Sequence, residues 1–247
     1  MNTNMVITQS VSESRMMLRR RETVFFSVLL PAMFMLLFGS IFGHEKDENG
    51  ITVINYLLPG YLVMAVMSVS FISLGIITAN ERQNSILKRL GATPLPRAVM
   101  IFGKIAAIGL VVTGAVTVLL GLAIVFYGVK IQGNPLAIAA IVILGILVFA
   151  TIGLMIGGAV KAEAAPAILN AVYFPLLFLG GALLPLTQMP DWLQQVARLL
   201  PSYHFTNALI EVMVRGQSLV DVWPNMAAMV AWGVGAILVA SRTFKWE

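Results

Sequence analysis

The sequence has no cysteine, only two histidines and few charged residues. The absence of cysteine excludes disulfides, thiolate metal sites and cysteine nucleophiles. Charged residues make up 11% of the 247 positions, roughly half their share in a soluble domain. Hydrophobic residues make up 59%, which leaves too little polar surface to cover a water-soluble globule. These shortages predict a membrane-embedded protein with short loops and no second large soluble domain.

Six apolar segments are each long enough to cross a bilayer as a helix, which takes about 20 residues. We expect these spans at residues 23–43, 53–79, 105–127, 136–160, 164–184 and 222–240. No convincing cleavage motif follows the first segment, so we interpret it as an uncleaved span and not as a signal peptide. The predicted fold is therefore all-α, with six transmembrane helices in one transmembrane domain over residues 1–247.

Basic residues are concentrated on one side of the six segments. Twelve of the sixteen Lys and Arg residues lie before the first segment, between the second and third, between the fourth and fifth, or after the sixth. Loops rich in Lys and Arg remain in the cytoplasm. We therefore predict that both termini are cytoplasmic. The net charge of +5 then reflects cytoplasmic loops in a multi-pass membrane protein and not a nucleic-acid partner.

Two stretches on the predicted cytoplasmic side have helical patterns of their own. Residues 1–22, with their arginine run, form either an amphipathic helix on the inner membrane surface or a disordered start. In the stretch 80–104, Ile86, Leu87 and Leu90 recur at helical spacing, which predicts a short amphipathic helix. That helix either rests on anionic lipid headgroups or docks a cytoplasmic partner.

The predicted outer side carries one long connection, residues 185–221. The segment DWLQQVARLL has one apolar face and is bracketed by Pro190 and Pro201. FTNALIEVMV forms a second amphipathic piece. We interpret the stretch as an extracellular helical hairpin that is re-entrant, dipping into the outer leaflet, or that caps it.

The chain shows no constellation for catalysis or for ion-driven transport. None of the six spans contains Asp, Glu, Lys or Arg, and such residues mark ion pathways in self-powered transporters. The glycine spacing over 128–133 is that of a phosphate-binding loop, but Asn134 and Pro135 follow where Lys and Ser or Thr are needed. His44 and His204 lie in separate loops and predict no metal site. We expect no cofactor in this chain and disfavour a polytopic membrane enzyme.

Mild polar and small residues remain inside the spans. Most hydroxyl and amide side chains there serve helix packing, and some could line a path for an amphipathic solute. The pairs Gly39 and Gly43, and Gly153 and Gly157, have the spacing that permits close helix approach, although such pairs are common by chance. The residues alone thus describe a six-helix membrane unit without an energy source of its own.

The order of these features resembles the membrane subunit of ABC-2 type exporters, the daunorubicin-resistance-like permeases, over nearly the whole chain. Pro31 lies within the first span, YLLPGYL opens the second, and ERQNSILKRLGATPLPR stands where the family has its coupling segment. The region of the fifth span has the family's glycine pair, Pro, Met-Pro-x-Trp, Pro-x-x-His and Arg-Gly. These occupy Gly180, Gly181, Pro185, Met189, Pro190, Trp192, Pro201, His204, Arg215 and Gly216. A minor departure is Gly180, where the family often has Ser.

The resemblance implies a mechanism that uses other subunits. Two permeases, as a homodimer or a heterodimer, pair above two nucleotide-binding ATPase subunits, which bind the ATP and Mg²⁺. The implied coupling residues, which contact the ATPase, are Glu81, Arg82, Ile86, Leu87 and Leu90. The implied path, lined by the second and fifth spans below an outer gate, has as candidates Ser70, Ser73, Asn170, Tyr173, Phe174, Phe178 and Pro185.

The implied function is export of an amphipathic or hydrophobic solute, such as a drug, an antibiotic or a lipid-like compound, from a bacterial or archaeal cell. The chain would then be a transporter subunit and not an enzyme. The alternative is a non-transporting sensor or assembly subunit that has the same fold.

Overall fold

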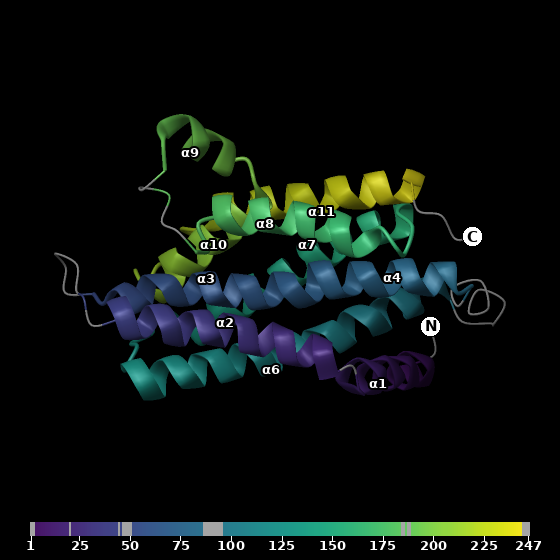
Figure 1. The fold of residues 1–247 in the computed structure, drawn as a ribbon, viewed down its shortest axis with the longest axis horizontal. Coiled ribbons are helices and arrows are strands. Elements are labelled where there is room, and N and C mark those ends of the chain that lie inside the picture. The colour runs from purple at the N-terminus through teal and green to yellow at the C-terminus, as the bar shows by residue number, and fades with distance from the viewer. Residues whose placement is uncertain are drawn as a thin grey trace.

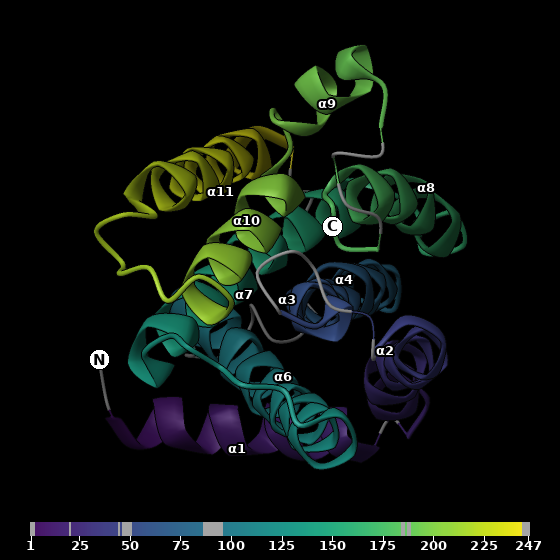
Figure 2. The ribbon, with the colours of Figure 1, turned by 90° about the vertical axis from the view of Figure 1, so that its left-hand side faces the viewer.

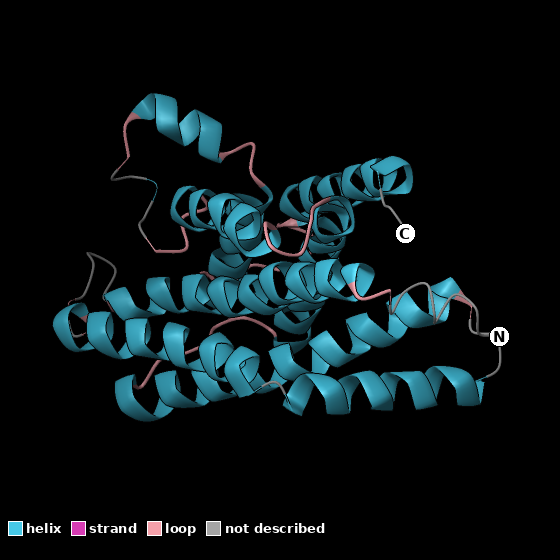
Figure 3. Ribbon diagram, turned by 45° about the vertical axis from the view of Figure 1, so that its right-hand side comes forward, coloured by secondary structure: helices cyan, strands magenta, loops and turns pink. Residues whose placement is uncertain are grey.

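The computed structural model describes residues 3–19, 21–43, 45, 51–85, 96–183, 186 and 189–243. In these residues the chain forms helices joined by turns, without a β-strand (Figure 3). The helices are α1 (Thr3–Arg19), α2 (Arg21–Phe42), α3 (Val53–Met67), the π-helix η1 (Ser68–Ser73), α4 (Leu74–Gln83), α6 (Arg97–Tyr127), α7 (Pro135–Ala159), α8 (Ala165–Leu179), α9 (Asp191–Ala197), α10 (Pro201–Met213) and α11 (Trp223–Thr243).

Each predicted span falls on a helix of the structure. Among the described residues, four helices are long and apolar enough to cross a membrane: Val53–Gln83, Val99–Tyr127, Pro135–Ala159 and Trp223–Thr243. Ser27–Phe42 and Ala165–Leu179 are shorter apolar helices. The chain is therefore a multi-pass membrane protein, and its two shorter apolar helices lie at the predicted first and fifth spans.

The long helices run side by side along the longest axis of the molecule (Figure 1). Figure 2 looks along that axis and shows α3 and α4 inside the bundle, with α2, α6, α7 and α8 around them. In the same view α1 is seen lengthwise, so it crosses the end of the bundle and packs against α6. Both termini lie at one end, and α9 lies toward the other.

The close crossing of α4 and α7 is made by glycines. A Cβ atom on Gly157 would lie 2.2 Å from the Gly75 carbonyl oxygen, and one on Gly153 would lie 2.6 Å from the Phe71 carbonyl oxygen. Only a residue without a side chain allows two helix backbones to approach so closely. The spacing of Gly153 and Gly157 permits such an approach, and here the structure uses it, whereas the equally spaced Gly39 faces the Tyr127 side chain and not a second backbone.

Several boundaries differ from those predicted. The helix of the second span continues to Gln83, and the helix of the third begins at Arg97, so the described ends of the 80–104 stretch are largely helical and not loop. Helix α8 ends at Leu179, five residues before the predicted limit, and Gly181 follows with a left-handed φ of 74°. Of the two interpretations of the N-terminal stretch, the helix holds, because α1 is seventeen residues long.

The two helices of the connection predicted on the outer side lie in different environments. Helix α9 begins after Pro190, as predicted, and its Trp192 is largely exposed. Helix α10 is part of the bundle, where it packs on α3, α7, α8 and α11. Its Phe205 is fully buried and lies 6.0 Å from Phe149 of α7, centroid to centroid. Helix α10 therefore anchors this connection in the bundle.

Candidate functional site

A π-helical turn interrupts the helix of the second predicted span. Within SVSFIS, the Ser73 hydroxyl donates to the Ser68 carbonyl oxygen at 3.0 Å, five residues earlier. In a regular α-helix two residues five apart point about 140° away from each other. The wider π turn brings Ser68 and Ser73 onto the same face, where both line a groove. Single π turns occur frequently at functional sites.

This groove lies between α2, the α3–η1 helix and α8, and has a volume of about 500 Å³. Its lining residues are mainly apolar or aromatic and none is charged. They are Ser27, Leu30, Phe34, Met64, Ser68, Ile72, Ser73, Asn170, Tyr173, Phe174, Leu177, Phe178 and Leu183. Small hydroxyls and one amide are thus the polar groups of a mostly hydrophobic surface, which suits an uncharged or weakly polar molecule.

Five of the predicted path residues meet in this groove, namely Ser73, Asn170, Tyr173, Phe174 and Phe178. Phe174 and Phe178 are 50% and 45% exposed, so their rings form open groove wall. The Tyr173 ring is buried and meets Phe174 edge to face at 5.6 Å. The amide of Asn170 donates to the Pro166 carbonyl oxygen at 2.8 Å.

Two predicted path residues do not join this group. Ser70 is fully buried, is absent from the groove lining, and donates its hydroxyl to the Val66 carbonyl oxygen at 2.5 Å. Pro185 lies outside the described residues. The sequence reasoning missed Ser27 and Phe34 of α2, and it noted Ser68 of η1 only as one of several mild polar residues in the spans. Ser68 and Ser73 are five residues apart, and this spacing places both on one face only in a π turn, which the sequence pattern did not predict.

A second groove of about 600 Å³ lies between α4, α6, α7 and α11. It is lined mainly by aliphatic side chains, with Thr78, Thr151, Ser241 and Lys104 as the polar ones. None of the predicted path residues lies there. The two grooves therefore provide a contrast for testing which one a solute follows.

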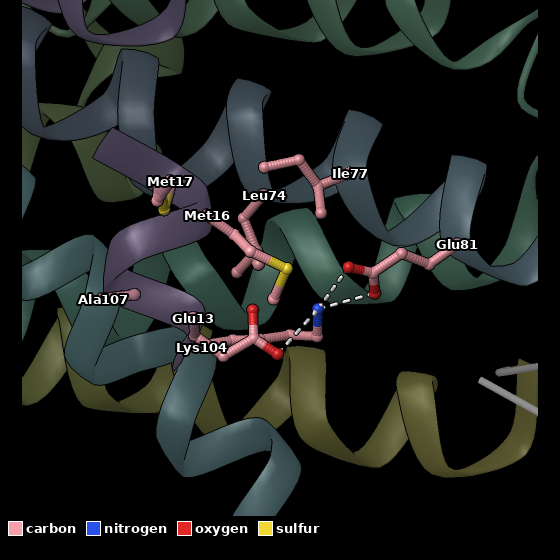
Figure 4. Close-up of a pocket in the computed structure, with 8 residues that line it drawn as sticks. All are labelled: Glu13, Met16, Met17, Leu74, Ile77, Glu81, Lys104 and Ala107. Atoms are coloured by element: carbon pink, nitrogen blue, oxygen red, sulfur yellow. Dashed lines mark hydrogen bonds and ion pairs between the residues drawn. The ribbon is translucent and has the colours of Figure 1, made fainter. Parts of the chain in front are cut away.

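The ends of α4 and α6 carry a buried ion cluster (Figure 4). The Lys104 Nζ of α6 donates to both carboxylate oxygens of Glu81, at 2.7 and 2.6 Å, and lies 3.8 Å from the Glu13 Oε1 of α1. The three side chains are 6%, 13% and 10% exposed, in that order. Glu81, predicted as a contact to an ATPase, thus has its carboxylate bound within the chain.

The neighbouring residues join α4 to the turn between α7 and α8. The Arg82 guanidinium donates to the Gly158 carbonyl oxygen and, at 2.6 Å, to that of Val160. The Gln83 amide donates to the Glu163 carboxylate at 2.6 Å, and this hydrogen bond is the main reason that the Glu163 pKa lies below its usual value. The Arg82 side chain, another predicted ATPase contact, therefore caps a helix end of its own chain. Ile86, Leu87 and Leu90 lie outside the described residues.

Sequence reasoning counted Lys104 only as a loop cation and did not consider Glu13. The three charges are 68 and 23 residues from one another along the chain, so no local pattern connects them. A lysine one residue before a predicted span, with a glutamate near the end of the preceding span, was the only signal in the sequence.

Comparison with known proteins places this arrangement in a family. Residues 7–214 match the ABC-2 type transporter family, which covers most of the described helices. The chain belongs to that family, as its sequence motifs indicated.

Relatives from several bacteria are transport permeases by name. The chain is 28% identical over 230 residues to "Putative transport permease YvfS" of Bacillus subtilis, covering 93% of this chain and 92% of the relative. It is 25% identical over 195 residues to the daunorubicin resistance ABC transporter permease protein DrrB1 of Streptomyces coeruleorubidus, covering 75% and 66% of the two chains. It is 25% identical over 193 residues to the inner membrane transport permease YhhJ of Escherichia coli, covering 74% of this chain and 50% of that relative.

Proposed function

We propose that this chain is the permease subunit of an ATP-binding-cassette exporter. A second permease copy pairs with it, and a separate ATPase subunit supplies the energy by binding ATP and Mg²⁺ and hydrolysing the ATP. The transported solute is amphipathic or hydrophobic and uncharged in its buried part. The membrane is the plasma membrane of a bacterium or archaeon, in keeping with the bacterial relatives.

The uncharged groove between α2, η1 and α8 carries this proposal, taken together with membership of the family. A charged solute would leave its charge without a partner against this lining, and that costs several kcal/mol in a site of low polarity. Phe174 and Phe178 offer flat apolar surface, while Ser68, Ser73 and Asn170 offer a few polar atoms. The name of DrrB1 connects that relative with resistance to daunorubicin, a drug, and supports a solute of this kind.

The distribution of charged residues supports an energy source outside this chain. Among the described residues, the groove lining has no Asp, Glu, Lys, Arg or His that could bind a driving ion. The described residues on either side of the 86–95 segment are instead bonded to α1, α6 and the α7–α8 turn. A partner that moves this segment would therefore move several helices.

The test is reconstitution of the chain with an ATPase subunit encoded beside it. We expect copurification of the two, ATP hydrolysis stimulated by solute, and ATP-dependent loss of solute from the compartment on the ATPase side. Leu87→Asp should abolish copurification, whereas Leu199→Asp, an exposed leucine after α9, should not. A chain that binds no ATPase, together with a Leu87→Asp variant that still exports, would sink the proposal.

The path is tested by adding bulk to one groove at a time. Ser73→Leu narrows the groove beside α8, and Thr151→Leu narrows the groove beside α11. Both wild-type hydroxyls are bonded to a backbone carbonyl of their own helix, so the two variants are chemically matched. We expect Ser73→Leu alone to lower transport. The alternative function, a sensor or assembly subunit, predicts binding of the ATPase without any ATP-dependent solute movement.

A further inference from the structure

The ion cluster at Lys104 joins three helices that are separate in sequence. The Lys104 Nζ of α6 is held by both oxygens of Glu81 on α4 and lies 3.8 Å from Glu13 on α1 (Figure 4). Gln9, one turn before Glu13, donates its amide to the Glu13 carboxylate at 2.9 Å. A Cβ on Gly103 would come within 2.9 Å of the Gln9 Cγ, so α1 and α6 pack closely beside the cluster.

The ion cluster lies between the two helices that flank the 86–95 segment. Glu81 on α4 lies five residues before that segment and Lys104 on α6 nine residues after it, so the ion pair joins these two helices. Arg82 and Gln83 join the end of α4 to the turn that leads into α8. The structure thus ties α1, α4, α6 and the start of α8 together at one end of the bundle.

A rigid connection runs from this cluster to the groove. Helix α4 continues without a break into η1, where Ser68 and Ser73 line one groove wall. Helix α8 provides the facing wall through Asn170, Phe174 and Phe178. Because both walls are anchored beside Glu81 and Arg82, a shift of the α4 end reaches the two walls together.

Stability alone does not account for these charges. Buried ion pairs often stabilise no more than apolar side chains of the same volume, because desolvation offsets their attraction. Their bonds are, however, directional, and they fix one arrangement of the helices. Lys104 donates to both oxygens of one carboxylate, which sets the position of α6 against α4 as aliphatic packing does not.

We infer that Lys104 is a positioning residue of the transport cycle, which holds α1, α4 and α6 as one unit so that motion of the α4 end is passed to η1 and the groove. This inference rests on the proposed function. It assigns a role to Lys104 and Glu13 that neither the family match nor the names of the relatives contain.

The first measurement follows the helices directly. The chain has no cysteine, so Val11→Cys on α1 and Asn84→Cys after α4, both at exposed positions, accept spin labels at two sites only. Pulsed electron paramagnetic resonance should give one narrow distance distribution for the otherwise native chain, with and without nucleotide on the complex. Lys104→Met should broaden the distribution, and Lys104→Arg should restore it.

The second measurement is the number of solute molecules moved per ATP hydrolysed in the reconstituted complex. Lys104→Met should lower this ratio by roughly 2- to 30-fold, the range for residues that carry coupling between sites, and Lys104→Arg should recover most of it. Arg215→Met is the matched control, because it removes a cation that is 56% exposed from its ion pair with Glu211 of α10. If Lys104→Met does not accumulate, Glu81→Gln takes its place, since the amide retains an acceptor for Lys104 but removes the charge.

The possible outcomes distinguish the positioning role of Lys104 from the proposed permease function. A wild-type complex that transports, with a Lys104→Met or Glu81→Gln ratio equal to wild type, overturns the role of Lys104 and leaves the proposed function intact. A narrow, unchanged distance distribution in the same variants also overturns it. A wild-type complex that neither binds the ATPase nor transports overturns the proposed function and the positioning role with it.

Discussion

Replacing Gly157 by alanine tests the packing of α4 on α7. The new Cβ would lie 2.2 Å from the Gly75 carbonyl oxygen and 2.9 Å from the Gly75 carbonyl carbon and Cα. Ordinary contact begins at 3.4 Å, so the two backbones must separate locally by about 1 Å, at the cost of dispersion contacts along both helices. The obstacle is backbone, which cannot rotate away as a side chain does.

We expect Gly157→Ala to lower the free energy of unfolding by about 1–3 kcal/mol, the usual cost of overpacking a filled interior. The separation also strains the bond from Arg82 to the Val160 carbonyl oxygen, since Arg82 is on α4 and Val160 ends α7. Loss of that bond adds about 1.5–3 kcal/mol at most, the range for a charged donor.

Glycine-to-alanine replacements with different room for the new Cβ form a graded series. Gly114→Ala on α6 has no atom within 4 Å of the new Cβ, and it should be neutral or stabilise by about 0.4–1 kcal/mol through the unfolded chain. Gly75→Ala meets the Leu169 side chain at 2.7 Å, which can turn aside, and the Gly153 carbonyl oxygen at 3.1 Å, which must give by only a few tenths of an ångström, so its cost should fall between the other two.

The assay is the fraction of purified protein that remains monodisperse after heating in one detergent, measured by size-exclusion chromatography over a temperature series. The order of midpoints should be Gly114→Ala, then Gly75→Ala, then Gly157→Ala as the lowest. A Gly157→Ala variant as stable as Gly114→Ala would refute the close helix crossing.

Two further predictions concern the two ends of the bundle. Phe205→Ala should destabilise the protein by about 3–5 kcal/mol, because the ring is fully buried against Phe149. In the same heating assay, Trp192→Ala should show little change, because Trp192 is exposed. Equal midpoints for the two variants would contradict the burial of α10. Gln83→Ala should raise the Glu163 pKa toward its ordinary value, because the main hydrogen bond that lowers it is removed. Since the folded pKa is the lower one, the bond stabilises above the ordinary carboxyl pKa and its contribution is lost as the pH falls through the folded pKa. Titration of ¹³C-labelled glutamate carboxyls by NMR would detect the rise; an unchanged titration would show that the bond does not form in solution.

The sequence was sufficient for features that depend on residues close together in the chain. Long uncharged apolar runs determined where the helices of all six predicted spans lie, because a backbone in lipid must satisfy its own hydrogen bonds. Pro190 marked the start of α9, and Pro201, predicted to close that helix, opens α10, since proline favours the first helical turn. The spacing of Gly153 and Gly157 permitted a close helix contact without requiring one. The family motifs, read along the chain, agreed with the family match.

The partners of each side chain required the tertiary structure. Helical periodicity places Ser70 and Ser73 on a span but does not reveal a π turn, which puts Ser73 with Ser68 in the groove and leaves Ser70 buried. Glu81 and Arg82 stand in a basic segment that suggested a docking surface, yet their charges are bound to Lys104 and to the end of α7. Those partners are 23 and 78 residues away, and only the packing of α4 between α6 and α7 brings them within hydrogen-bonding distance, where burial makes each charge require a partner.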